Sequence, residues 1–306
     1  MIGIDWGTTA FRAYRLAPGG GVRDRIEREG GILTVPPGGF PAALREAIGP
    51  WLAEGERRVL LCGMVGSRQG WQEAPYLPCP AGPAEIAAAV IALPFEGAAC
   101  RLVPGLTARD AAGVPDVMRG EETKLLGLLA ELPAGAEALV CLPGTHSKWA
   151  RLAGGGIAGF ATQMTGETRA VLLQHSILGR LAEPGPSSGT GSDAAFRRGV
   201  RRAGDPGGLL HHLFGTRALG LAGELAATET ASYLSGLLIG HELRSVLAEG
   251  VPQGPVHQGM VHLAGSETLC HAYALAFAEH GLAHRRHADD IVARGLALIA
   301  EMIPWP

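Results

Sequence analysis

Short apolar runs alternate along the chain with longer segments whose apolar residues recur at helical spacing. Runs of the first kind are typical of buried strands, and segments of the second kind of amphipathic helices. The alternation predicts an α/β fold. We expect strands at residues 1–5, 11–16, 58–62, 101–103, 138–142, 148–152, 157–161 and 260–264. We expect helices at residues 41–52, 84–91, 121–132, 168–181, 194–203, 228–247, 268–280 and 290–302.

A strand, a turn with a Gly-Thr step and a second strand occur twice, first around Asp5 and again around Thr145. The repetition predicts two lobes built on related β-sheets, with helices added to the second. The boundary is expected in the polar segment 105–116, which contains Gly, Pro and Ala. The expected N-terminal lobe is residues 1–110 completed by the C-terminal helix 290–306, and the expected C-terminal lobe is residues 111–289.

The first of these turns joins a carboxylate, a glycine and two hydroxyls, which are Asp5, Gly7, Thr8 and Thr9. The glycine lets backbone N–H groups approach phosphate oxygens, and the threonines donate further hydrogen bonds. Asp5 is the expected Mg²⁺ ligand, because Mg²⁺ prefers carboxylate oxygen and keeps several waters. The pattern therefore predicts a nucleotide phosphate site. An ordinary hairpin turn with Asx-type hydrogen bonds has the same composition and is the alternative.

The second turn contains Gly144, Thr145 and Lys148 and follows a buried strand. Two Gly-Thr turns that present themselves to one nucleotide would hold the phosphates of ATP between them. Lys148 would neutralise a phosphate or a substrate carboxylate, or would simply extend from an exposed strand end. Gly265 and Ser266 precede a helix, where a glycine allows close approach of an adenine or ribose and the helix N-terminus favours anions. A plain loop is the alternative for this third element.

Two carboxylates, Glu121 and Glu122, open a helix between the two turns. Phosphoryl transfer to an alcohol needs a carboxylate near the attacking hydroxyl to orient it and accept its proton. We expect Glu121 to be this base and Glu122 to be the second candidate, with Asp116 and Asp110 as further candidates. Acidic residues in a first helical turn also complement the helix dipole without any catalytic role.

A glycine-rich loop follows the strand at residues 58–62 and predicts a small-molecule pocket. Its candidate substrate residues are Gly63, Met64, Gly66, Ser67, Arg68 and Trp71, together with Arg119 from the segment before Glu121. Arg68 is able to pair bidentately with a carboxylate. The alternative is an ordinary connection in which Trp71 only packs.

Charge and cysteine content narrow the class of protein. Lys and Arg number 26 against 29 Asp and Glu, a net charge of −3, so nothing indicates a nucleic acid or an anionic membrane as partner. The Arg pairs at 197–198 and 201–202 are interpreted as a solvated helix face. No apolar run reaches the roughly 20 residues of a membrane span. Five scattered cysteines predict buried thiols in a reducing, cytoplasmic compartment.

Two further expectations concern metals and assembly. No HExxH, H-x-E or CxxC string occurs, so no transition-metal site is expected. The apolar helix 231–243 is interpreted as core, and a homodimer interface is the alternative.

Seven strings run in order along almost the whole chain: IDWGTT (4–9), GMVGS (63–67), APYL (74–77), VMRGEET (117–123), PGTHSKW (143–149), MTGE (164–167) and LSGLLIG (234–240). Together they resemble the 2-keto-3-deoxy-galactonate kinase family of the actin/hexokinase superfamily. The resemblance implies a two-lobed, actin-like and ribonuclease H-like ATPase fold with a nucleotide cleft between the lobes. It also implies ATP, Mg²⁺ and phosphorylation of the C6 hydroxyl of 2-dehydro-3-deoxy-D-galactonate in galactonate degradation.

A sugar acid carries a carboxylate that neutral sugars lack, and we expect Arg68, Arg119 or Lys148 to bind it. Three other functions are weighed. The first is a kinase of 2-keto-3-deoxygluconate or of a neutral sugar, and the second is a non-catalytic nucleotide- or sugar-binding regulator on the same fold. A Rossmann oxidoreductase is disfavoured, because no G-x-G-x-x-G follows the first strand.

Overall fold

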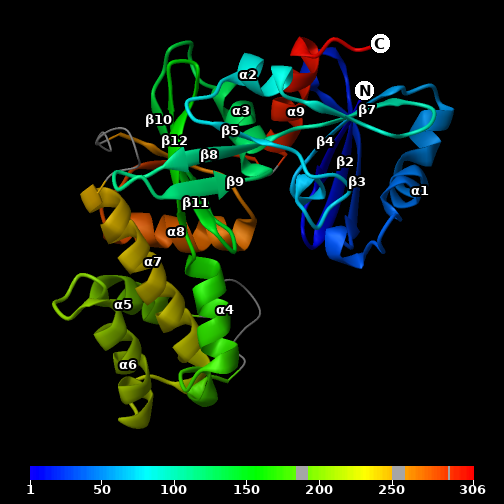
Figure 1. Ribbon diagram of the computed structural model, residues 1–306. Helices are drawn as coiled ribbons and strands as arrows, with labels where there is room; N and C mark the ends of the chain where they lie inside the picture. The colour runs from blue at the N-terminus through cyan, green and yellow to red at the C-terminus, as the bar shows by residue number, and fades with distance from the viewer. Residues whose placement is uncertain (184–191, 250–258, 289) are drawn as a thin grey trace. The chain divides into compact units, whose positions relative to one another are not determined.

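The computed structural model describes residues 1–183, 192–249, 259–288 and 290–306 (Figure 1). Two compact units divide the chain. Unit 1 comprises Met1–Glu137, Leu152–Gly159 and Asp290–Pro306, and unit 2 comprises Ala138–Arg151 and Phe160–Asp289. The contacts therefore group residues 111–137 with the N-terminal unit, whereas we expected the boundary between residues 110 and 111.

The main sheet of unit 1 has the strand order β3-β2-β1-β4-β7-β6. Strand β1 pairs antiparallel with β2 and parallel with β4, and β4 pairs parallel with β7. Asp5 lies opposite Cys62 in the parallel pair, so the carboxyl ends of β1 and β4 meet at one edge. The strands are β1 (Ile2–Trp6), β2 (Ala10–Leu16), β3 (Val22–Glu29), β4 (Arg58–Cys62), β6 (Ile91–Leu93) and β7 (Ala99–Leu102).

Helices cover both faces of this sheet, which explains why β1 and β4 are continuous apolar runs. On one face Ile4 and Leu61 share a buried cluster with Leu44 of α1 (Phe40–Ala53). On the other face Gly3 lies against α9 (Ile291–Met302). A Cβ on Gly3 would come within 2.9 Å of Leu296 Cδ1, so glycine lets the Leu296 side chain pack closely against the strand.

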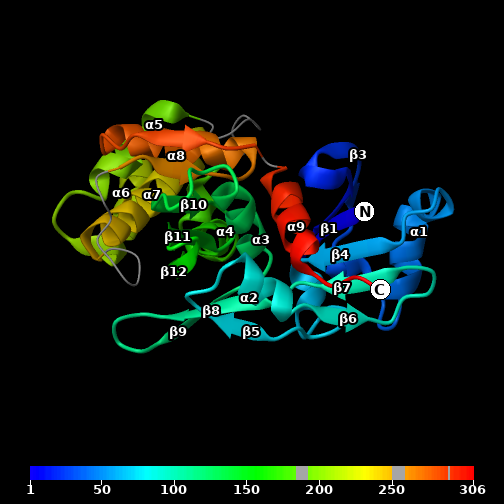
Figure 2. The same cartoon turned by 90° about the horizontal axis from the view of Figure 1, so that it is seen from above.

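Helix α3 (Glu121–Leu129) crosses α9 through two glycines, and Figures 1 and 2 show the two helices side by side. A Cβ on Gly127 would lie 2.0 Å from the Ile291 carbonyl oxygen, and a Cβ on Gly295 would lie 1.8 Å from that of Thr123. The backbones therefore touch, and this contact anchors the candidate catalytic helix to unit 1.

The sheet with strand order β12-β11-β10-β13-β14 repeats the order β3-β2-β1-β4-β7 of the first sheet. Strand β13 pairs parallel with both β10 and β14. The repeated order confirms the predicted α/β fold of the actin-like, ribonuclease H-like type. The strands are β10 (Ala138–Leu142), β11 (Ser147–Ala153), β12 (Gly156–Gln163), β13 (Val261–Leu263) and β14 (His284–Arg286).

Helices α5 and α7 of unit 2 also cross through glycines (Figure 1). A Cβ on Gly199 would lie 2.1 Å from the Tyr233 carbonyl oxygen, and one on Gly236 would lie 1.9 Å from that of Phe196. Leu234 and Leu237 of α7 are fully buried, so these apolar residues serve the core. The helices of this unit are α4 (Thr165–His175), α5 (Asp193–Arg202), α6 (Gly208–Leu221), α7 (Thr230–Glu249) and α8 (Glu267–Glu279).

The sequence pattern did not predict strands β3, β5, β6, β8, β9 and β14 or helix α6. Strand β3 is an edge strand whose charged residues are mostly exposed, so no apolar alternation marks it. A three-stranded sheet, β5-β8-β9, consists of short strands: β5 (Tyr76–Pro78), β8 (Gly105–Arg109) and β9 (Pro115–Met118). Helix α6 was also missed, because its apolar residues lie on several sides. Helix α2 (Pro83–Ala88) was predicted, but it ends earlier than expected.

Two expectations about chemistry bear on the fold. All five cysteines are free, and burial raises the pKa of Cys62, Cys100 and Cys141 above that of an ordinary thiol. Within the described ranges, no helix is both long enough and apolar enough to cross a membrane.

Candidate active site

The carboxyl ends of β1 and β4 meet the start of α3 in unit 1. A Cβ on Gly63 would lie 2.8 Å from the Trp6 carbonyl oxygen and 3.1 Å from Asp5 Oδ1. A Cβ on Gly120 would lie 3.0 Å from the Gly63 Cα. Both glycines have positive φ, 95° and 103°, where other residues are strained. The two glycines therefore allow Asp5, the Gly63 loop and Glu121 to converge.

The backbone of the turn after β1 is held by hydrogen bonds, and its two threonine side chains are exposed. Gly7 donates its N–H to the Ala10 carbonyl oxygen at 2.9 Å, and its own carbonyl accepts from the Ile32 N–H at 3.0 Å. Thr8 and Thr9 are exposed. The backbone of the turn is thus fixed while the two threonines remain accessible to a ligand.

Glu121 and Glu122 differ in environment although they are neighbours in α3. Glu122 is only 1% exposed; its Oε2 accepts from the Gly120 N–H at 2.6 Å and its Oε1 from the Thr123 hydroxyl at 2.9 Å. Burial, and secondly the charge of Glu121, raises the Glu122 pKa from 4.5 to about 8. Glu121 is half-buried, and one of its oxygens accepts from the Arg119 N–H at 3.0 Å. Glu122 fixes the turn, and Glu121 faces a more open environment.

Arg119 is a buried cation, 7% exposed, and not all of its N–H donors are hydrogen-bonded in the described part of the chain. Its Nη2 donates to the Ala74 carbonyl oxygen at 2.7 Å, and its guanidinium lies 4.3 Å from the centre of the Tyr76 ring. Its Nε and Nη1, and the hydroxyl of Ser67, are buried with no hydrogen-bond partner in the described part of the chain. Each such orphan costs roughly 1–3 kcal/mol. The donors are therefore suited to an incoming anion.

Gly66 holds the loop against this cation, because a Cβ there would lie 3.0 Å from Arg119 Nη1. The other side chains of the loop have different neighbours. Arg68 is 88% exposed and forms an ion pair with Glu73 at 3.6 Å. Trp71 stacks on Phe40 with ring centres 6.5 Å apart. The structure thus brings Gly63, Gly66, Ser67 and Arg119 together, and it places Arg68 at the surface.

The remaining residues of this loop and the further acidic candidates have structural contacts. Met64 and Trp71 both pack against the core cluster beside α1. Asp110 accepts from the N–H groups of Ala112 and Val114 in the turn between β8 and β9. Asp116 lies in β9 and accepts from the N–H of Val117.

A cavity of about 310 Å³ in unit 2 opens beside the turn after β10. This volume lies at the lower end of the range usual for small-molecule sites. Its walls come from that turn, α4, α7 and α8: Gly144, Thr145, Thr165, Gly166, Arg169, Ser235, Leu238, Ile239, Thr268, Leu269, Ala272 and Tyr273.

The start of α4 braces the Gly144 turn. A Cβ on Gly166 would lie 2.5 Å from the Gly144 carbonyl oxygen, and the Glu167 N–H donates to the Thr145 carbonyl oxygen at 2.9 Å. The Gly265 turn before α8 lies beside it, because a Cβ on Gly265 would come within 3.4 Å of the Pro143 carbonyl oxygen. The second phosphate turn and the adenosine turn predicted from sequence are therefore neighbours.

A buried carboxylate, Glu242, supports two walls of this cavity. It is 4% exposed and accepts from Trp149 Nε1 at 2.7 Å, from the Tyr273 hydroxyl at 2.8 Å and from the Thr165 hydroxyl. Burial raises its pKa, and the three donors partly offset this shift. Sequence reasoning missed Glu242. A lone carboxylate within the apolar helix 231–243 was the available signal.

Two cations from the segments that follow the Gly144 turn, Arg169 and Lys148, have different surroundings. Arg169, which sequence reasoning also missed, lines the cavity and donates to the Ser235 hydroxyl at 2.5 Å. Lys148 is 5% exposed, donates to the Thr162 hydroxyl at 2.6 Å and is not among the cavity walls. It is thus buried, which rules out an exposed strand end. Ser266 is exposed at the N-cap of α8.

Asp5 is the metal position predicted from the sequence. Among the described residues, no group of three or more His, Cys, Asp or Glu side chains is placed to hold a metal ion. Asp5 is a single carboxylate beside a phosphate-type turn. Such a donor set suits Mg²⁺, which is usually bound through one or two carboxylates, waters and phosphate oxygens.

Two sheets that share a strand order, each with a glycine turn at the end of its first strand, define an actin-like fold. A family model described as 2-keto-3-deoxy-galactonokinase matches residues 5–299. The chain therefore belongs to the 2-keto-3-deoxy-galactonokinase family. It is a phosphotransferase, and its family implies that it uses ATP.

Individual relatives agree over almost the full length. A Rhizobium meliloti (strain 1021) protein named as a 2-dehydro-3-deoxygalactonokinase is 40% identical, over 99% of this chain and 97% of that protein. The Escherichia coli (strain K12) protein of that name is 34% identical, over 92% and 90%. A crystal structure from Sinorhizobium meliloti, titled for the same kinase, has a TM-score of 0.87 at 39% identity and covers 100% of this chain and 97% of that one.

Proposed function

We propose that the protein transfers the terminal phosphoryl group of ATP to the C6 hydroxyl of 2-dehydro-3-deoxy-D-galactonate. The names of its relatives supply the substrate class. The observation that carries the proposal is the buried Arg119, whose side chain has unpaired donors and whose backbone N–H donates to Glu121 of α3. A kinase of a neutral sugar has no need of such a cation, whereas a sugar acid supplies the carboxylate that pairs with it.

Arg119 is the cation that we propose for the substrate carboxylate. It is pre-oriented by Ala74 and Tyr76, so little side-chain entropy is lost when an anion binds. The Ser67 hydroxyl adds a further unpaired donor on the same loop. Arg68, exposed and paired with Glu73, is the natural control.

Glu121 is the base that we propose. With a pKa of about 8, Glu122 holds a proton at neutral pH, and both of its oxygens already accept hydrogen bonds. Glu121 is half-buried and has one oxygen without a hydrogen bond in the described part of the chain. It is therefore better placed to orient the substrate hydroxyl and accept its proton.

We propose that the glycine turns hold the nucleotide. Gly7, Thr8 and Thr9 in unit 1 and Gly144 and Thr145 in unit 2 offer N–H and hydroxyl donors to phosphate oxygens. The cavity beside Gly144 is suited to the nucleoside. Mg²⁺ held through Asp5 would neutralise phosphate charge. Cytoplasmic location and a homodimer remain predictions.

The first experiment compares substrates. A coupled ADP-release assay is run with the galacto and gluco epimers of the 2-keto-3-deoxy acid and with galactose as a neutral sugar. We expect the highest kcat/KM with the galacto acid. A higher kcat/KM for the gluco acid would overturn the epimer assignment, and no ADP with any acceptor would favour a binding protein.

The second experiment removes the cation. Because a hydrogen bond to a charged group contributes about 1.5–3 kcal/mol, Arg119→Gln should raise the KM for the acid roughly 10- to 100-fold, with little change in the KM for ATP. Arg68→Gln is the matched control and should leave both constants unchanged. A KM that responds to Arg68→Gln and not to Arg119→Gln would contradict the assignment.

A further inference from the structure

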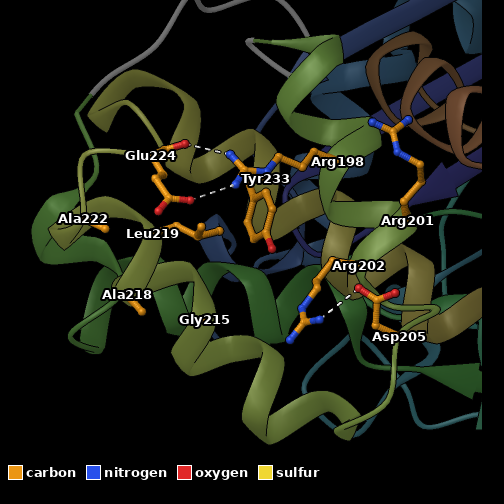
Figure 3. A pocket seen from close by; sticks show the side chains of 10 residues that line it. All are labelled: Arg198, Arg201, Arg202, Asp205, Gly215, Ala218, Leu219, Ala222, Glu224 and Tyr233. Carbon is orange, nitrogen blue, oxygen red and sulfur yellow. Dashed lines mark hydrogen bonds and ion pairs between the residues drawn. The ribbon is translucent and has the colours of Figure 1, made fainter.

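A second cavity in unit 2, of about 530 Å³, lies between α5, α6 and α7 (Figure 3). None of its lining residues belongs to the cavity beside Gly144. It is therefore a separate feature, and the proposed kinase reaction does not use it. Its walls are Arg198, Arg201, Arg202, Asp205, Gly215, Ala218, Leu219, Ala222, Glu224 and Tyr233.

Small residues on α6 keep this space open. Gly215, Ala218 and Ala222 recur at helical spacing and therefore share one face of the helix with Leu219. A Cβ on Gly215 would meet no atom within 4 Å. Larger side chains at these positions would fill the gap between the helices. The wall formed by α6 is thus apolar, and its small side chains leave space beside the helix, as in many small-molecule sites.

A tyrosine side chain lies at this cavity. Tyr233 is 2% exposed as a residue, it lines the cavity, and its hydroxyl makes no hydrogen bond within the described ranges. Figure 3 shows the Tyr233 ring between Arg198 and Arg202. The guanidinium of Arg198 lies 5.9 Å from the ring centre.

Arg198 and Arg202 have N–H donors that their present contacts do not use. Arg198 donates to the Glu224 carbonyl oxygen at 2.7 Å, but its distance to the Glu224 carboxylate is 3.9 Å. Arg202 pairs with Asp205 at 2.9 Å, and Arg201 pairs with Glu279 at 3.0 Å. Arg198 and Arg202 each offer several donors in a planar fork, of which these contacts use only some.

We infer that this cavity binds a small organic anion, whose carboxylate or phosphate group pairs with Arg198, Arg202 and the Tyr233 hydroxyl. The apolar face of α6 accepts a flat or aliphatic body. The combination of a cationic wall, a tyrosine hydroxyl at the cavity and an apolar wall is what such a ligand needs.

The test is calorimetric titration of the full-length protein with three probes of one shape: benzoate, phenyl phosphate and the neutral benzamide. We expect saturable binding of at least one anion at millimolar concentration or below, and weaker binding of benzamide. The stronger of the two anions identifies the preferred head group. Absence of saturation by both anions, or equal affinity for benzamide, would overturn the inference.

Variants locate the binding. Arg198→Gln should weaken the preferred anion about tenfold, in line with a charged hydrogen bond. Tyr233→Phe should weaken it measurably, and Gly215→Leu should abolish it by filling the cavity. Arg197→Gln is the control, because Arg197 is the next residue in α5, pairs with Glu279 and does not line the cavity. Equal losses in Arg197→Gln and Arg198→Gln, or binding unaffected by Gly215→Leu, would place the anion elsewhere.

Discussion

The turn after β1 and the turn after β10 occupy the same place in two sheets of the same strand order, yet their surroundings differ. Carboxylates and one buried arginine gather near the first turn: Asp5, Glu121, Glu122 and Arg119. Hydroxyls and one half-buried arginine gather near the second: Thr165, Ser235, Thr268 and Arg169. The two sheets therefore share a backbone arrangement, but the helices that follow them place different side chains beside the two turns.

In each unit a glycine at the start of a helix makes a close backbone contact beside these side chains. In unit 1 Gly120, just before α3, lies against Gly63 of the loop after β4, and in unit 2 Gly166 of α4 lies against Gly144 of the turn after β10. The helix brings the functional side chains with it. Substitutions beside the turn of unit 1 should therefore lower kcat. Substitutions beside the turn of unit 2 should instead raise the KM for ATP.

Glu121→Gln tests the chemistry of unit 1 and should have the largest effect. Removal of a general base lowers kcat by roughly 10² or more. The KM for ATP should change little, because Glu121 is not among the proposed nucleotide contacts. Steady-state kinetics with both substrates varied measure the two constants separately.

Glu122→Gln is the matched control, since glutamine retains an oxygen that can accept from the Gly120 N–H. Its kcat should fall less than that of Glu121→Gln. The reverse order would transfer the base role to Glu122.

The same variant tests the burial of Glu122 through the pH dependence of stability. The folded-state pKa is raised to about 8, so the folded protein binds the proton more tightly than the unfolded chain does. The contribution of Glu122 to the free energy of unfolding therefore falls as pH rises from about 4.5 to about 8, by on the order of 2–4 kcal/mol. Glu122→Gln removes this dependence.

Urea unfolding at pH 5 and pH 8 measures the effect. We expect the stability of the variant relative to the native protein to increase at the higher pH. A relative stability of Glu122→Gln that is the same at both pH values would contradict the buried, proton-holding carboxyl.

Much of the fold could be predicted from the sequence, because its central strands are buried on both faces. Strands β4 and β10 have the bounds that the sequence predicts, residues 58–62 and 138–142. Strand β3 and helix α6 could not be predicted in this way, since β3 is a charged edge strand and α6 has exposed apolar residues such as Leu210 and Phe214. The local pattern of apolar residues indicates which elements have one buried face. β3 and α6 do not show that pattern.

The candidate site could be predicted in part. Glycine-hydroxyl turns are local in sequence, so the turns at Gly7, Gly144 and Gly265 could be recognised. Glu242 and Arg169 could not, because their partners are distant in the chain: Trp149 for Glu242 and Ser235 for Arg169. Such contacts depend on helix packing that no local pattern encodes.

Gly166→Ala tests the turn of unit 2 and should have the smallest effect of the three. An added Cβ would lie 2.5 Å from the Gly144 carbonyl oxygen and 2.8 Å from the Thr145 Cα, so the turn must shift. We expect the KM for ATP to rise about tenfold, the equivalent of roughly 1.4 kcal/mol, with a smaller change in kcat. Gly49→Ala in α1 is the control, because a Cβ there meets no atom within 4 Å. A fall in kcat as large as that of Glu121→Gln, with an unchanged KM for ATP, would show that the two turns do not divide chemistry and nucleotide binding between them.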